Sequence, residues 1–133
     1  MTEPAPPSPP RVVVFGSRSW ANEGTIATRL AQLPVDWIIT HGACPFDRWG
    51  RSADMLADRV ARRLGRAVDP YPANWSVYGL AAGPRRNEFM AALPGVVLGI
   101  GFREQGKSNG TDGMCRLLLA RGVPVECYGW GWA

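Results

Sequence analysis

The stretch Val12-Val13-Val14-Phe15-Gly16-Ser17-Arg18 decides the fold of this chain. Its apolar run is continuous over residues 12–15, which is typical of a strand that is buried on both faces of a parallel sheet. Gly16-Ser17-Arg18 ends the strand. Glycine lets backbone N–H groups approach a ligand closely, and the serine hydroxyl and the arginine fork both suit a phosphate. The stretch therefore predicts the first strand of an α/β sheet, followed at once by a candidate phosphate loop.

Outward from this stretch, apolar runs alternate with segments of helical periodicity. Further strands are expected over residues 35–40, 67–71, 96–100 and 123–128. The expected helices carry Ile26, Leu30 and Leu33 before Pro34, then Met55, Leu56, Val60 and Leu64 before Gly65, then Phe89, Met90 and Leu93 after Pro84, and finally residues 111–120. Residues 72–79 and 102–110 are expected to be loops. Strict alternation predicts a Rossmann-like, doubly wound parallel α/β sheet of five strands in the order 3-2-1-4-5, with helices on both faces.

Composition limits the architecture and the partners. The chain has 133 residues, of which 46% are hydrophobic, so we expect one domain over residues 11–133 after a disordered, proline-rich lead over residues 1–10. A net charge of +4 favours an anionic partner. The arginines are spread along the chain rather than clustered, which argues against a nucleic-acid surface. Three cysteines and one histidine without ligand spacing predict no metal and no cofactor. No apolar run approaches the roughly 20 residues of a membrane span, so a cytoplasmic protein without a membrane partner is expected.

The predicted strand order has a consequence for ligand binding. The first and fourth strands would lie side by side at the point where the sheet reverses direction, and ligands of such sheets bind in the crevice there. The loops that follow these two strands are Gly16–Arg18 and the glycine-rich segment Gly106–Thr111. Gly110-Thr111 is expected to open a helix, whose N–H groups and dipole favour a phosphate. Two loops distant in sequence are therefore predicted to form one anion site.

Residues Gly101 to Ser108 match the P-loop pattern Gly-x-x-x-x-Gly-Lys-Ser. A true P-loop runs directly into its helix, so that the serine reaches magnesium. Here Asn109-Gly110 follows, and Thr111-Asp112 are the better residues to cap a helix. No apolar strand ends in an aspartate suited to a second magnesium contact. A P-loop NTPase is therefore a minor alternative.

Other candidate ligand contacts stand beside simpler interpretations. Arg86 and Asn87 lie early in a helix, where Arg86 would face the crevice while Arg85 is solvated. Gly42 follows the second strand, and the preceding His41 is expected to bond neighbouring backbone rather than ligand. Asp54 stabilises a helix start and is a further ligand candidate. Four aromatic residues are candidate stacking partners for a base, although packing is the favoured role for each: Trp20, Trp49, Trp75 and Tyr78.

Six short motifs occur in an order that resembles one family. They are Gly16-Ser17-Arg18, His41-Gly42-Ala43, Ser52-Ala53-Asp54, Asn74-Trp75, Ala82-Gly83-Pro84-Arg85-Arg86-Asn87 and Gly110-Thr111. Together they resemble the YspA-like branch of the SLOG superfamily, Rossmann-like relatives of the Lonely guy phosphoribohydrolases and of DNA-processing protein A. The resemblance implies a nucleotide-derived ligand, a homodimer, and a setting near bacterial or phage conflict systems. The arginine used by the phosphoribohydrolase branch would correspond to Arg86.

The chain departs from that family at three places. The position of the catalytic glutamate, three residues after Thr111, is Met114, which leaves Asp112 as a candidate carboxylate on the wrong side of the helix. Ser108-Asn109 stand where the family has a glycine pair. Residues Phe46–Arg51 lengthen the link between the second and third motifs and are expected to form a lid or a partner surface.

The expected function is binding or sensing of a nucleotide-derived phosphate ligand. The contacts would come from Gly16, Ser17, Arg18, Gly42, Asp54, Arg86, Asn87, Gly110 and Thr111. Alternatives are a phosphoribohydrolase that cleaves nucleoside monophosphates with Arg86 and Asp112 as catalytic candidates, the P-loop NTPase, and a single-stranded nucleic-acid platform.

Overall fold

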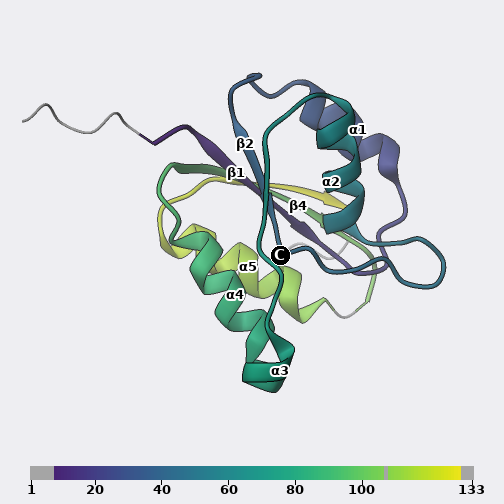
Figure 1. The fold of residues 1–133 in the computed structure, drawn as a ribbon, viewed down its shortest axis with the longest axis vertical. Coiled ribbons are helices and arrows are strands. Elements are labelled where there is room, and N and C mark those ends of the chain that lie inside the picture. The colour runs from purple at the N-terminus through teal and green to yellow at the C-terminus, as the bar shows by residue number, and fades with distance from the viewer. Residues whose placement is uncertain (1–7, 107, 130–133) are drawn as a thin grey trace, which may run out of the picture.

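The protein is a five-stranded parallel sheet with helices packed on it, seen in a computed structural model that describes residues 8–106 and 108–129 (Figure 1). The strands lie in the order β3-β2-β1-β4-β5, and every neighbouring pair is parallel. Their bounds are β1 Arg11–Gly16, β2 Ile38–His41, β3 Val68–Pro70, β4 Val96–Arg103 and β5 Val125–Gly129. The predicted α/β class, Rossmann-like topology and strand order are confirmed.

The helices follow the strands in chain order. Their bounds are α1 Glu23–Ala31, α2 Ala53–Arg63, α3 Trp75–Tyr78, the 3-10 turn η1 Gly79–Ala81, α4 Ala82–Ala91 and α5 Asn109–Ala120. Figure 1 shows α1 and α2 on one side of the strands and α4 and α5 on the other. In the described part of the chain, no helix has the length and apolar character that crossing a membrane requires.

The strand β1 supplies both halves of the core. Val12 and Val14 pack with the apolar faces of α1 and α2, whereas Val13 and Phe15 pack with α4 and α5. Val12, Val13 and Val14 are completely buried. The continuous apolar run therefore marks a central strand, as its sequence predicts.

The first helix pair is fixed by caps and ion pairs. Asn22 accepts a hydrogen bond from the Thr25 N–H (3.1 Å) at the start of α1. Ser52 accepts one from the Met55 N–H (3.1 Å) at the start of α2. Such N-caps satisfy backbone donors that the helix leaves unpaired. The Glu23 carboxylate on α1 binds the guanidinium groups of two arginines on α2, Arg59 and Arg63.

The segment after β4 differs from the sequence prediction. β4 continues to Arg103, because Gly101 and Phe102 pair with β1 on one side and with β5 on the other. The buried Phe102 ring also lies 5.4 Å from the Trp20 ring and 5.3 Å from the Tyr128 ring, measured between centroids. The predicted loop over residues 102–110 is therefore shorter than expected. α5 also begins earlier, at Asn109 rather than Thr111.

Smaller differences concern the other loops. The predicted loop 72–79 contains the single-turn helix α3, which Asn74 caps by accepting from the Val77 N–H (3.3 Å). α4 starts at Ala82, and Pro84 lies in its first turn, as expected for a proline at the start of a helix. β2 starts at Ile38 because Val35 lies outside the sheet and is 80% exposed. The proposed disorder of residues 1–10 falls mostly outside the described residues.

Candidate functional site

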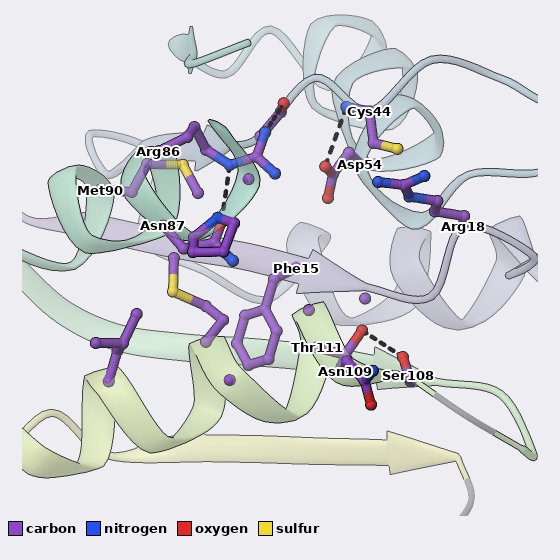
Figure 2. A pocket seen from close by; sticks show the side chains of 18 of the residues that line it. Phe15, Arg18, Cys44, Asp54, Arg86, Asn87, Met90, Ser108, Asn109 and Thr111 are labelled. Atoms are coloured by element: carbon purple, nitrogen blue, oxygen red, sulfur yellow. Dashed lines mark hydrogen bonds between the residues drawn. The ribbon is translucent and has the colours of Figure 1, made fainter. Parts of the chain in front are cut away.

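A cavity of about 910 Å³ opens at the carboxyl ends of β1 and β4 (Figure 2). This is the switch point of the sheet, where the strand order reverses. All nine ligand contacts expected from the sequence line the cavity: Gly16, Ser17, Arg18, Gly42, Asp54, Arg86, Asn87, Gly110 and Thr111. The prediction that the two loops lie together at this end of the sheet is thus confirmed.

Three hydroxyl groups connect the loops. The Ser17 Oγ accepts a hydrogen bond from the Glu104 N–H (2.9 Å) and lies 3.0 Å from the Ser108 Oγ. The Ser108 hydroxyl donates to the Thr111 Oγ1 (2.7 Å). Since Ser108 gives its proton to Thr111, the Ser17 hydroxyl must donate to Ser108. In this chain of hydroxyl groups, Ser17 donates to Ser108 and Ser108 donates to Thr111, so both hydrogen bonds are directed toward the Thr111 hydroxyl.

The first turn of α5 lies at the end of this hydroxyl chain. The first N–H groups of any helix have no acceptor within the helix. Ser108 occupies the N-cap position, but its hydroxyl oxygen accepts no hydrogen bond from a backbone N–H of the helix, and its proton is donated to the Thr111 hydroxyl. Asn109 and Gly110 are exposed and line the cavity. Backbone donors, a hydroxyl and the positive end of the helix dipole thus share one end of the cavity.

The Arg86 side chain crosses from α4 to the end of β2. Its Nη1 donates to the Gly42 carbonyl and to the Tyr71 carbonyl (3.3 Å), and its Nε donates to the Asn87 Oδ1 (2.8 Å). Burial lowers the pKa of the guanidinium, and nearby Asp54 and Cys44 offset this only in part. Arg86 is therefore a positioned and poorly solvated positive charge in the cavity wall (Figure 2). Arg85 lies over the Tyr78 ring at 4.6 Å instead, as expected for the outward arginine.

Two predicted glycines are needed for packing. A Cβ on Gly42 would overlap the Arg86 guanidinium. A Cβ on Gly16 would overlap the Phe102 carbonyl and Ala53 at the start of α2. Gly42 makes room for a charged group of the site, and Gly16 lets β1, β4 and α2 approach one another.

Asp54 is a buried carboxylate in the cavity wall, at the start of α2. It is 7% exposed and accepts one hydrogen bond, from the Cys44 N–H (3.1 Å). Burial raises its pKa, and the hydrogen bond from the Cys44 N–H and the charges of Arg86 and Arg18 offset the rise only partly. A titratable group perturbed by burial beside charged neighbours in a cavity is a typical functional candidate.

Asp112, the other acidic candidate, lies outside the cavity lining. Its carboxylate accepts from the Arg103 Nε (2.7 Å) and Nη2 (3.0 Å), and the Arg103 hydrogen bond lowers its pKa. This carboxylate therefore fixes the first turn of α5 to the end of β4. The position gives no support to a catalytic role for Asp112.

The P-loop resemblance changes in two ways. The argument that Asn109-Gly110 separates the motif from its helix is wrong, since α5 begins at Asn109. Gly101, however, is a β4 residue paired with Phe15 and Cys127. The motif's first glycine thus belongs to the sheet rather than to a phosphate-wrapping loop. Lys107 lies outside the described residues.

His41 takes the structural role that the sequence analysis favoured. Its Nδ1 accepts from the Ala43 N–H (2.9 Å), and its Nε2 lies 2.7 Å from the Asp58 Oδ2. Because Nδ1 accepts a hydrogen bond, the ring proton is on Nε2 and is donated to Asp58. His41 is fully buried and does not line the cavity.

The inserted segment 46–51 folds around Asp47. The Asp47 Oδ1 accepts from the Trp49 and Arg51 N–H groups, both at 2.9 Å. Trp49 is 64% exposed and lies beneath the guanidinium groups of Arg48 and Arg51, at 4.1 and 4.7 Å from its ring centroid. No residue of this segment lines the cavity, so it does not act as a lid in this structure.

Sequence reasoning missed the apolar part of the cavity. This lining comes from Phe15 on β1, Met90 on α4, and Met114, Leu117 and Ala120 on α5. The sequence analysis also favoured a packing role for Trp75. In the structure this half-exposed ring lines the cavity, and its centroid lies 5.8 Å from the Arg18 guanidinium. The spacing of three between Thr111, Met114 and Leu117 was the available signal, because such residues share one helix face.

Comparison of the chain with protein family models, with curated proteins and with solved structures finds no match. Within residues 8–106 and 108–129, no group of three or more His, Cys, Asp or Glu side chains is placed to hold a metal ion.

Proposed function

We propose that the protein binds a nucleotide-derived phosphate ligand in the switch-point cavity. The observation that carries the proposal is the hydroxyl chain from Ser17 through Ser108 to Thr111, which ends at the open first turn of α5. An anion there would accept from the Thr111 hydroxyl and from the adjacent N–H groups. Both kinds of donor stabilise phosphate at helix N-termini.

The charges of the cavity wall fit the same class of ligand. Arg18 and Arg86 line the cavity with Asp54, so the three groups carry a net charge of +1 before any ligand binds. A phosphate would add favourable partners for both guanidinium groups. The Asp54 carboxylate would accept a hydrogen bond from a ribose hydroxyl. It has the capacity to do so, because the hydrogen bond from the Cys44 N–H uses only one of its oxygens.

The six motifs shared with the YspA-like branch of the SLOG superfamily support membership of that family. Each motif contributes at least one residue to the cavity lining, and the second, third and fourth do so through Gly42, Asp54 and Trp75 alone. This convergence on one cavity favours a common ligand-binding role for the motifs. We extend the proposal to a homodimer as that family implies.

Ligand binding is tested by thermal shift and calorimetry with AMP, ADP-ribose, NAD and cyclic nucleotides. A ligand at 100 times its Kd stabilises the native state by about 2.7 kcal/mol, so at least one compound should raise the Tm clearly. Thr111→Val keeps the side-chain volume but removes the last hydroxyl. It should weaken binding about tenfold, the scale of one hydrogen bond to a charged group.

Thr111→Ser is the matched control, because it retains the hydroxyl at the same position. Its affinity for the ligand should be within about twofold of that of the natural protein, because the hydrogen bond from the hydroxyl is retained. If no compound in the panel stabilises the protein, or if both Thr111 variants bind like the natural protein, the proposal is wrong.

A second candidate function is hydrolysis of the N-glycosidic bond of AMP to adenine and ribose 5-phosphate. Its support is the location of Asp54, a cavity carboxyl with a raised pKa. A carboxylate near the sugar would stabilise positive charge that develops during cleavage. Adenine release from AMP, lost in Asp54→Asn, would support hydrolysis. Binding without any release would leave the protein a binder or sensor.

A further inference from the structure

Two of the three cysteines lie outside the cavity lining, Cys115 on α5 and Cys127 on β5. Successive side chains of a strand point to opposite faces of its sheet. On β5, Glu126 binds Arg29 of α1, and the Tyr128 ring packs with the apolar cluster beneath α1 and α2. Cys127 lies between these two residues and therefore faces the other side of the sheet, which α5 covers.

The packing of α5 on β5 brings the two cysteines together. The side chains of Leu118 on α5 and Val125 on β5 both lie against Gly99. Because α5 returns the chain between two parallel strands, it runs antiparallel to them. Cys115 is three residues before Leu118, about 4.5 Å along the helix, and Cys127 is two residues after Val125, about 6.6 Å along the strand. Both steps lead in the same direction, so the cysteines are neighbours.

The two thiols interact and differ in access to solvent. The Cys115 thiol is a hydrogen-bond partner of the Cys127 thiol, and this contact adds to the effect of burial in raising the pKa of Cys127. Both cysteines are free thiols, with Cys127 exposed and Cys115 half-buried. Among the described residues, β5 is an edge strand that pairs only with β4. An exposed thiol beside a second one suits thiol–disulfide exchange, in which the first attacks and the second resolves.

We propose that Cys115 and Cys127 form a dithiol site that a low-molecular-weight disulfide oxidises to a reversible internal disulfide. The Cys127 thiolate attacks one sulfur of the reagent, whose S–S bond breaks as the mixed disulfide forms, and one reagent thiol leaves. The Cys115 thiolate then attacks the Cys127 sulfur and displaces the second reagent thiol. The protein loses two electrons and two protons, and the two released thiols carry them. This site goes beyond the proposed ligand binding and does not depend on it.

The test is incubation of the natural protein with excess oxidised glutathione, alkylation of the remaining thiols in denaturant, and peptide mass spectrometry without reduction. Trypsin cleaves after Arg116 and Arg121, so the two cysteines lie on different peptides unless a disulfide joins them. We expect the Cys115–Cys127 cross-link to exceed the glutathione adduct on Cys127 at least tenfold, because the resolving thiol is already in place. Cys44 should remain open to alkylation, and dithiothreitol should restore all three thiols.

Two variants separate the attacking thiol from the resolving one. Cys115→Ser should accumulate the glutathione adduct on Cys127, because nothing displaces it. Cys44→Ser is the matched control and should form the internal disulfide like the natural protein.

The proposal is wrong if the natural protein keeps both thiols alkylatable or retains glutathione on Cys127. A disulfide that involves Cys44 or joins two chains would also overturn it. These outcomes are read from the natural protein, so a misfolded variant would not prevent the decision. They are also independent of nucleotide binding, so failure of either proposal leaves the other standing.

Discussion

The two faces of the sheet are built for different purposes. On the face covered by α1 and α2, a large cluster of buried apolar side chains reaches from Val12 and Val14 to Ile26 and Leu30. On the face covered by α4 and α5, the buried cluster is smaller, and its members Phe15, Met90 and Met114 also line the cavity. One face therefore supplies most of the packing, which allows the other to leave space at its end.

The same contrast occurs within α2, between two aspartates that are four residues apart. Asp54 lines the cavity, and burial raises its pKa. Burial also opposes ionisation of Asp58, but hydrogen bonds from Arg62 and His41 outweigh this effect and lower its pKa. The ionised form of Asp58 stabilises the fold, whereas the ionised form of Asp54 is held at a cost to it.

The largest expected effect distinguishes the two apolar clusters. Leu30→Ala should lower the free energy of unfolding by about 3–4 kcal/mol, because a fully buried leucine leaves a cavity in close-packed surroundings. Leu117→Ala should cost about 2 kcal/mol or less, because Leu117 is only partly buried and lines the ligand cavity. Urea unfolding measures both. An equal cost would mean that the two faces are packed alike.

The next effect concerns the two aspartates. Asp58→Asn should cost about 1–2 kcal/mol near pH 7, because it weakens hydrogen bonds from His41 and Arg62 to a charged acceptor. Asp54→Asn retains an oxygen for the Cys44 N–H and removes a buried charge, so the Tm should stay level or rise. A loss of stability in Asp54→Asn equal to that in Asp58→Asn would contradict the contrast.

The pH dependence of these two variants should have opposite signs. The Asp58 pKa is lowered in the folded state, so its contribution is present above the ordinary value of 3.8 and is lost as the pH falls toward the folded pKa. The cost of ionised Asp54 is present above its raised folded pKa and disappears as the pH falls through that value toward 3.8. On acidification the Tm of both variants should therefore approach the Tm of the natural protein. The Tm of Asp58→Asn should do so from below and that of Asp54→Asn from above. Tm values from pH 3 to pH 7, in roughly half-unit steps across the carboxyl range, test this.

The smallest effect is expected at Asp112. Its ion pair with Arg103 is partly exposed, so Asp112→Asn should lower the Tm by only about 2–4 °C. AMP binding should be unchanged, because Asp112 does not line the cavity. If the variant lost ligand binding or turnover with little change in Tm, Asp112 would return as a functional carboxylate.

The topology of the sheet and the meeting of the two loops at one site could be predicted from the sequence. The run 12–15 is apolar throughout because both faces of β1 are covered, and alternation along the chain then leaves few arrangements. The end of β4 was not predictable in this way. Phe102 and Arg103 resemble a polar loop until their partners Trp20, Tyr128 and Asp112 are known. The apolar part of the cavity lining was missed because Met114 and Leu117 have the same spacing in a core helix as in a cavity wall.

The hydrogen bond between Ser17 and Ser108 joins positions that are 91 residues apart. A phosphate gripped from both segments would act as a reversible cross-link that closes a loop through most of the chain. Separating β4 and α5 from β1 would then require ejecting the ligand, so occupancy would slow global unfolding as well as shift its equilibrium. Cellular proteases act on the opened chain. The lifetime of the protein would in this way follow the concentration of the small molecule that it holds.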